Sequence, residues 1–369
     1  MMWNKRSGLL AATLALTALT ACGSDSDKKP GDPRAGVNPA PPGAPWETLS
    51  EWRLFDDIEQ QKPAKGVIHF EVNSVLFADE ADKIRFLWLP ENQKIAYKDV
   101  DRWDFPVGSI LVKTFMYPHD ARDPAMGRRL LETRLLVREP DVWAAYIYVY
   151  TDSQANAEER SAGPTLPVTR IDQTGATRED RYNVPSEFEC QSCHGTLPEM
   201  YPLGPRTRQL DRVNDYGDGP ENQIDYLAKL GLLDVSPPAE RQRLTDPYGD
   251  GPIAERARSY LDANCGHCHS PERKADSTGF YVDYDSTDPV RGNRLHWGEC
   301  KFPTSAGHAG GDLKYDIVPG NPEQSILVHR VASIEPDVKM PPLPTRLADA
   351  QGVQVMRDWI ASMTPRSCD

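Results

Sequence analysis

Apolar and polar residues alternate along several segments between Trp46 and Pro185. In 131–137 (LETRLLV) and 143–149 (WAAYIYV), apolar side chains recur at alternate positions, which places them on one face of an extended strand. The segments 66–72, 84–89 and 107–117 follow a similar pattern, and Pro, Gly and Asp separate them. We therefore expect about six to nine strands, arranged as an antiparallel β-sandwich or a partly open, barrel-like sheet.

Three tyrosines, Tyr146, Tyr148 and Tyr150, fall on one face of their predicted strand. Such a stripe either docks a partner or a sugar, or packs against another layer of the same protein. Packing is the commoner role of a row of aromatic side chains.

Beyond Pro185 the apolar residues recur with a helical period. Ser186 can cap a short helix that carries Cys190 to His194, and the segments 221–233 and 350–363 each present one apolar stripe. The segment 252–269 (PIAERARSYLDANCGHCH) begins with Pro at a position that suits a helix start, and its C-terminal end is rich in Cys and His. The second half of the chain is therefore predicted to be mostly α-helical.

Two copies of one chemical motif lie in this helical half. Cys190-Gln-Ser-Cys193-His194 and Cys265-Gly-His-Cys268-His269 both have the Cys-x-x-Cys-His spacing, by which two thiols bond to the vinyl groups of haem and the histidine binds its iron. We therefore predict a diheme c-type cytochrome, in which Cys190, Cys193, Cys265 and Cys268 carry two covalently bound haem c groups. His194 and His269 are the predicted iron ligands.

A second axial ligand is expected for each iron. For the second haem the best candidate is Met340, because a Met-Pro pair in a loop before a closing helix is the arrangement of class I cytochromes c. For the first haem Met200 is a weaker candidate, six residues after His194. The alternatives are an open position or one of six other histidines: His69, His119, His267, His296, His308 and His329.

The N-terminus has the features of an export signal. Lys5 and Arg6 precede an apolar run over 8–21, which is too short for the about 20 residues of a membrane span. Small residues then precede Cys22, as in bacterial lipoproteins, so we expect a signal peptide over 1–21 and lipidation of Cys22; an ordinary secretory signal is the alternative. The residue after Cys22 is not Asp, which favours the outer membrane of a Gram-negative cell envelope, on either its periplasmic or its surface face.

Seven cysteines are then accounted for. One is lipidated, four hold haem, and Cys300 and Cys368 remain. Disulfides persist in an exported protein, so these two are predicted to form one, with two free thiols as the alternative. The formal net charge of −13 argues against nucleic acid as a partner and is compatible with redox partner proteins in the cell envelope.

The predicted fold class is α+β. We expect a disordered tether over 22–45, an antiparallel β-sandwich or barrel-like domain over 46–185, a first haem-binding helical segment over 186–247 and a second haem-binding cytochrome c domain over 248–369.

Several runs outside the two motifs resemble a known family. They are 73–79 (NSVLFAD), 83–86 (KIRF), 105–108 (FPVG), 113–115 (KTF), 132–135 (ETRL) and 318–325 (VPGNPEQS), which together with the motifs are similar to bacterial diheme c-type cytochromes with an N-terminal β domain. The resemblance implies haem binding and electron transfer.

Three functions are compatible with these features. The first is a lipid-anchored carrier of single electrons. The second is a peroxidase-like diheme enzyme with one open-coordinate haem, and the third is a surface-binding module in which the β domain recognises a polymer or protein.

Overall fold

The computed structural model describes residues 36–195, 200–343 and 345–369. The predicted signal peptide and Cys22 lie outside these residues. Within the described ranges, no helix combines the length and the apolar character needed to cross a bilayer.

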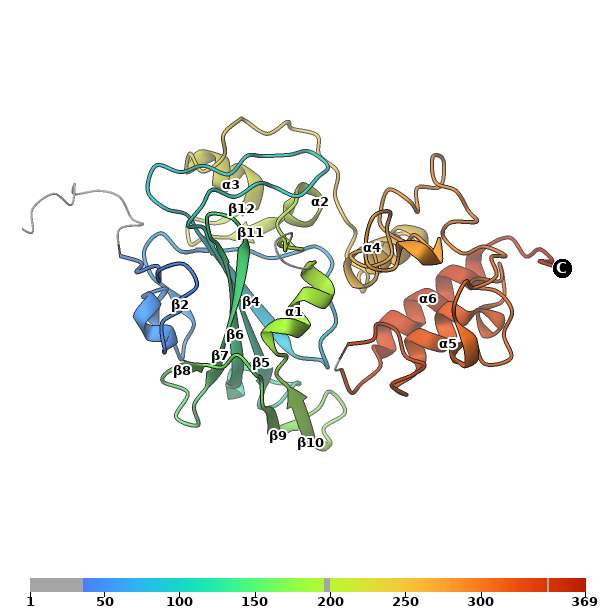
Figure 1. Cartoon of the computed structure of the whole chain (residues 1–369), viewed down its shortest axis with the longest axis horizontal. Helices are drawn as coiled ribbons and strands as arrows, with labels where there is room; N and C mark the ends of the chain where they lie inside the picture. Colours follow the sequence, from blue (N-terminus) through green and yellow to red (C-terminus); the bar gives the residue numbers. More distant parts are fainter. Residues whose placement is uncertain (1–35, 196–199, 344) are drawn as a thin grey trace, which may run out of the picture. The chain divides into compact units, whose positions relative to one another are not determined.

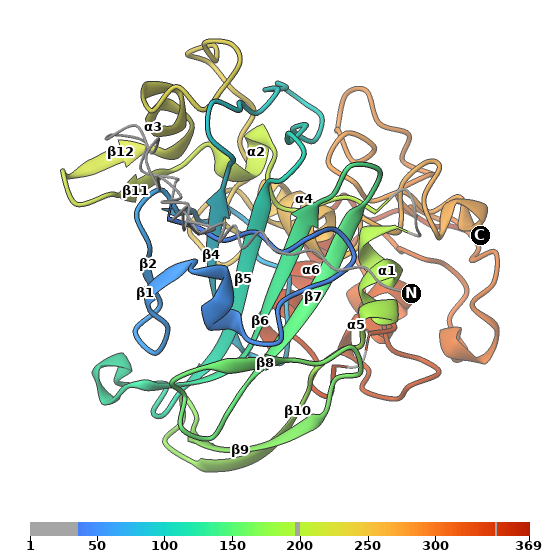
Figure 2. The ribbon, with the colours of Figure 1, turned by 60° about the vertical axis from the view of Figure 1, so that its left-hand side comes forward.

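A six-stranded antiparallel sheet forms the centre of the N-terminal part (Figures 1 and 2). Its strands follow one another in chain order: β3 (Ile68–His69), β4 (Asp82–Trp88), β5 (Ile110–Pro118), β6 (Arg128–Arg138), β7 (Trp143–Tyr150) and β8 (Ala157–Glu159). Three separate antiparallel pairs accompany it: β1 (Phe55–Asp57) with β2 (Lys62–Pro63), β9 (Thr165–Ile171) with β10 (Thr177–Asn183), and β11 (Val213–Asp215) with β12 (Pro220–Asn222).

The helices come mainly after the sheet. They are α1 (Glu187–His194), α2 (Thr207–Leu210), α3 (Gln223–Lys229), α4 (Ile253–Asn264), α5 (Ile326–Ala332) and α6 (Ala350–Ser362). Short 3-10 turns lie at Leu49–Trp52, Pro124–Met126, Asp276–Thr278, Gly307–Gly310 and Pro322–Gln324. The chain is thus α+β, as the sequence predicts.

The alternation along the strands divides their side chains between two cores. Leu111 of β5 and Ala145 of β7 belong to the core on one face, together with residues of α2 and α3. Ile110 of β5 and Leu135 of β6 belong to the core on the other face, which the segment from Val37 to Val67 covers. Both faces of the sheet are therefore buried.

The predicted sandwich differs from this arrangement. A single sheet lies at the centre, and helices and irregular segments cover it where a second large sheet was expected. Among the described residues β3 pairs with β4 alone and β8 with β7 alone, so the sheet is open and does not close into a barrel.

Two further expectations are resolved by burial. Tyr146, Tyr148 and Tyr150 lie in the core under Trp52, which confirms the packing role of the tyrosine stripe. The end of the expected tether packs as well, because Val37 is buried in this core and the Asn38 N–H donates to the Trp52 carbonyl. The ordered part therefore begins before Trp46.

The C-terminal helices form a third core. Tyr260 and Leu261 of α4 pack with Met356 and Trp359 of α6 and with α5. Gly352 allows this close approach, because a Cβ there would overlap the Tyr260 ring.

A disulfide joins Cys300 to Cys368 and closes a loop over 68 positions of the chain. Replacing both cysteines by alanine is expected to lower the free energy of unfolding by about 2–4 kcal/mol, because the unfolded chain regains the entropy of that loop. Urea denaturation followed by far-UV circular dichroism measures the change. An unchanged midpoint would show that the bridge contributes nothing to stability.

Candidate functional site

The first motif sits on α1, against the central sheet (Figure 1). Ser186 caps this helix, since its hydroxyl accepts from the Glu189 N–H while the Glu189 carboxylate accepts from the Ser186 N–H. The helical spacing then brings Cys190, Cys193 and His194 to neighbouring positions on the helix surface. Cys190 is 8% exposed and belongs to the core on that face of the sheet.

His194 has the geometry of a preset metal ligand. Its Nδ1 lies 2.8 Å from the Tyr201 carbonyl oxygen, which favours the tautomer with the proton on Nδ1 and the lone pair on Nε2. Burial lowers the pKa of His194 to about 3, so the ring is neutral at physiological pH. A neutral imidazole with a free Nε2 is the form that binds iron.

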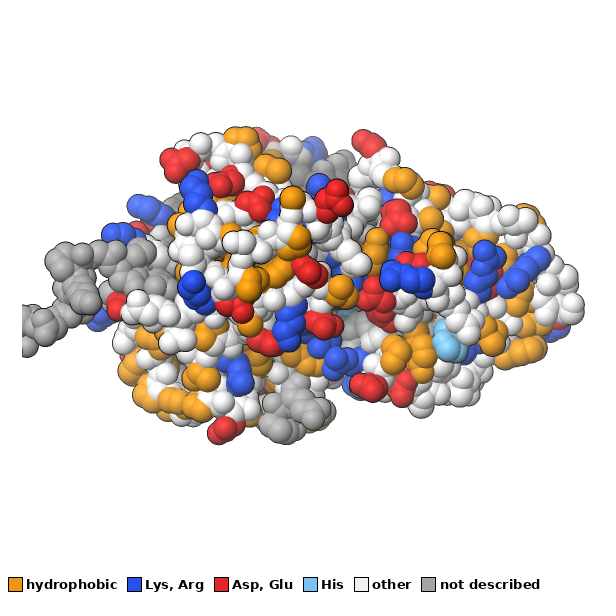
Figure 3. Space-filling model, turned by 90° about the horizontal axis from the view of Figure 1, so that it is seen from above, with side chains coloured by type: hydrophobic (Ala, Val, Ile, Leu, Met, Phe, Trp, Pro, Cys, Tyr) orange, Lys and Arg blue, Asp and Glu red, His pale blue; other side chains and the backbone are white. Residues whose placement is uncertain are grey.

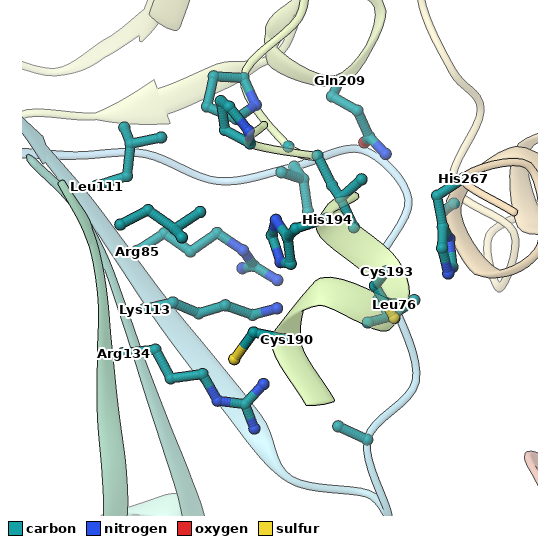
Figure 4. A pocket seen from close by; sticks show the side chains of 18 of the residues that line it. Leu76, Arg85, Leu111, Lys113, Arg134, Cys190, Cys193, His194, Gln209 and His267 are labelled. Carbon is teal, nitrogen blue, oxygen red and sulfur yellow. The ribbon is translucent and has the colours of Figure 1, made fainter. Parts of the chain in front are cut away.

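A cavity of about 390 Å³ opens beside this motif (Figure 4). Apolar residues line much of it, among them Phe70, Val72 and Leu111 from the sheet side. Cys190, Cys193 and His194 are also part of its wall. A space with apolar walls, two thiols and a neutral histidine suits a porphyrin held by thioether bonds.

Three basic side chains of the sheet also border this cavity. In Figure 4, Arg85, Lys113 and Arg134 extend side by side from the sheet toward Cys190 and His194. A Glu71 oxygen lies 3.3 Å from Arg85 Nη1, and the Glu132 carboxylate binds Arg134 Nε and Nη2 at 2.9 and 2.6 Å. The two guanidinium groups are therefore neutralised by ion pairs.

The second motif follows the C-terminal end of α4. Cys265 packs against the core of the C-terminal helices, and the N–H groups of Cys268 and His269 donate to the Cys265 carbonyl. His269 Nδ1 lies 3.2 Å from the Phe280 carbonyl oxygen, and burial lowers the pKa of His269. The two motif histidines thus share one arrangement, with Nδ1 at a backbone carbonyl and Nε2 available.

The two motifs lie in contact, which the sequence did not indicate. Cys268 Sγ is 3.6 Å from the backbone oxygen of Ser192, a residue inside the first motif. His267, inside the second motif, lines the cavity of the first, and its buried Nδ1 makes no hydrogen bond among the described residues. Any groups attached to the two motifs therefore lie next to each other.

Contacts between the segments that flank the two motifs hold the motifs close together. The Ser74 hydroxyl donates to the Ser259 carbonyl at 2.8 Å, and the Phe77 N–H donates to Asn264 Oδ1 at 2.8 Å. Arg206 forms an ion pair with Asp262 of α4. The loop after β3 and the segment after the first motif are thus both bound to α4.

The two predicted methionine ligands lie in different surroundings. Met200 is 5% exposed and belongs to the same core as Cys190, but it is not one of the described residues that line the cavity. Met340 is half-buried, and its N–H donates to the Arg330 carbonyl. Ligation of iron by Met200 and by Met340 stays a prediction.

The residues present fit haem c better than a bare metal ion. Cys190, Cys193, Cys265 and Cys268 are all outside disulfides. Across the described ranges, no group of three or more His, Cys, Asp or Glu side chains is placed to hold a metal ion. A haem iron needs one or two protein ligands, because the porphyrin supplies the other four.

Comparison with known proteins gives one result. A family model described as Planctomycete cytochrome C matches residues 292–344, a stretch that follows the second motif and includes Met340. No curated protein and no solved structure matches the chain. The matched stretch, next to a Cys-x-x-Cys-His motif, shows that the C-terminal part of the chain contains a region like a c-type cytochrome.

Proposed function

We propose that this protein is an exported, lipid-anchored diheme c-type cytochrome that transfers single electrons. The contact between the two motifs is the observation that carries this proposal. When bound, each haem supplies an iron that changes between the ferrous and ferric states.

The protein's own groups hold and shield the two sites. The four free thiols form the thioether bonds, and the carbonyls of Tyr201 and Phe280 orient His194 and His269. The apolar part of the wall around the first motif would limit the contact of a bound haem with water, and so the reorganisation that accompanies a change of charge.

Contact between the motifs favours electron exchange within the molecule. Each thioether bond fixes one edge of a porphyrin at its motif, and Cys268 Sγ is 3.6 Å from the first motif's backbone. Haems attached to these two motifs would lie near each other, and this proximity would favour electron exchange between them.

The cellular place is part of the proposal and is supported by the sequence. Lipidation of Cys22 would anchor the protein to a membrane of the Gram-negative cell envelope, with the outer membrane favoured. Its partners would be redox proteins of that envelope. On the face that Figure 3 presents, basic and acidic side chains are interspersed, so this face does not single out a partner of one charge.

Haem stoichiometry tests the proposal directly. The full chain, produced in a host that matures c-type cytochromes, should carry two covalent haem adducts by intact-protein mass spectrometry. A pyridine haemochrome assay should give two haems per chain. One adduct, or none, would refute the diheme assignment.

Carbon monoxide distinguishes the electron carrier from the peroxidase-like alternative. A carrier with two six-coordinate haems should give the same ferrous absorption spectrum with and without carbon monoxide. A large shift of half of the Soret absorbance would instead indicate one open iron.

Replacing Met340 by alanine tests the second site. If Met340 binds iron, we expect the second haem to become high-spin and its reduction potential to fall, because the thioether stabilises the ferrous state. Optical spectra and redox titration measure both effects. Met356→Ala is a control that removes a buried methionine of α6, and it should leave the spin state unchanged.

A further inference from the structure

Three basic residues form one row across three neighbouring strands. Arg85 of β4 is paired in register with Lys113 of β5, and Lys113 is paired with Arg134 of β6. Side chains at such directly opposed positions are close neighbours, and like charges there repel one another. A row of this kind beside an apolar cavity needs a physical explanation.

Lys113 is the member of the row without a counter-charge. Glu71 neutralises Arg85, and Glu132 neutralises Arg134. Among the described residues, Lys113 Nζ has no hydrogen bond and no ion pair. It lies 4.9 Å from the centroid of the Phe115 ring. Its side chain keeps some exposed surface because the amine borders the cavity.

The surroundings favour the neutral form of this amine. Burial lowers the pKa of Lys113 well below its usual value, and the positive charges of Arg85 and Arg134 lower it further. A neutral amine carries a lone pair, and without a donor to satisfy it that lone pair is available to a metal. Nitrogen bases of this kind are suitable ligands for iron.

His194 points into the same part of the cavity. In Figure 4 its ring extends from α1 toward the sheet, where the Lys113 amine ends between the guanidinium groups of Arg85 and Arg134. Its Nε2 is free because Nδ1 is held by the Tyr201 carbonyl. In the same view His267 lies on the other side of α1 from the sheet.

We propose that Lys113 Nζ would bind the first haem iron as a second protein ligand, in addition to His194. This inference rests on the proposed attachment of haem to Cys190 and Cys193. It replaces Met200, which does not border the cavity, as the ligand of this site. Arg85 and Arg134 then act as positioning residues, because they flank the lysine and disfavour its protonation.

The test uses the full-length holoprotein and two variants of Lys113. Lys113→Met removes the nitrogen ligand, and Lys113→Arg keeps a long basic side chain that is always protonated and cannot bind iron. The wild type should show one low-spin haem with two nitrogen ligands in electron paramagnetic resonance and near-infrared magnetic circular dichroism. Both variants should lose this signal, so that about half of the total haem becomes high-spin or changes its ligand type.

Matched variants separate ligation from other roles. Lys83→Met removes another partly buried lysine of the same sheet, whose amine already donates to the Ala81 carbonyl, and should leave the spectra unchanged. His267→Ala and Met200→Leu should also leave the first haem low-spin. An unchanged spectrum in Lys113→Arg overturns the proposal, as does loss of the two-nitrogen signal in His267→Ala. A histidine–methionine signal of the first haem in the wild type that Met200→Leu abolishes overturns it as well.

Mass spectrometry of each variant distinguishes failure of the Lys113 ligand assignment from failure of the proposed diheme function. If Lys113→Arg carries two haem adducts and its first haem has an unaltered spectrum, Lys113 is not the iron ligand, but the diheme function still stands. Fewer than two adducts on the wild-type chain refute the diheme function, and with it the inference.

Discussion

A variant with alanine at both Cys190 and Cys193 is expected to carry one haem and to lose most of its native stability. These thiols stand in the wall of a cavity of about 390 Å³ between α1 and the sheet. Without haem, the apolar part of this wall would face water, so we expect a large loss of stability. Intact-protein mass spectrometry counts the adducts, and urea denaturation with limited proteolysis measures the stability.

The control for this variant removes the two cysteines that form the disulfide. Alanine at Cys300 and Cys368 should leave two haems in place and should cost no more than about 4 kcal/mol. If the Cys190 and Cys193 variant still carried two covalent haems, the cavity would not be a haem site. If it lost one haem but kept the urea midpoint of the wild type, the bound haem would not contribute to stability.

Replacing Glu132 by glutamine is expected to destabilise the protein by about 3 kcal/mol. The Glu132 side chain is fully buried and binds the Arg134 guanidinium through both oxygens, and the Tyr182 hydroxyl donates to it at 2.6 Å. Glutamine preserves the size and one acceptor but removes the charge, so that the Arg134 cation remains without its partner beside an apolar cavity. The free energy of unfolding from urea titration measures the loss.

An exposed pair provides the comparison. Glu158 forms an ion pair with Arg160 in which both side chains are about half exposed, so Glu158→Gln should change stability by less than about 1 kcal/mol. Equal effects of the two substitutions would show that the Glu132 charge has no special role. A haem-loaded Glu132→Gln protein should also reveal any effect of this charge on the first haem's potential.

Much of the sheet was predictable because strand periodicity is a local property. Alternation within 131–137 and 143–149 located β6 and β7, and 107–117 located β5. The same alternation indicates that one face of each strand is apolar, but it shows neither that both faces are buried nor what covers them. The cover on one face is the irregular segment from Val37 to Val67, which has no periodic pattern to reveal it, so a second sheet was expected in its place.

The candidate site was predictable where its chemistry is contiguous in the chain. Cys190, Cys193 and His194 are close in sequence, and the spacing alone identified them. The row of Arg85, Lys113 and Arg134 depends on the register of three strands, which no single segment specifies. The sequence did contain a sign that these three basic residues are unusual. Each of them occupies the face of its strand that otherwise holds apolar side chains such as Leu87, Leu111 and Leu136.

The burial of Cys190 bears on how the molecule is made. In the folded chain Cys190 is 8% exposed, whereas Cys193, Cys265 and Cys268 keep some exposed surface, so Cys190 is the thiol that an enzyme joining porphyrin to the chain would reach least easily. If haem is joined to Cys190 as proposed, its attachment would have to precede complete folding of the segment around α1.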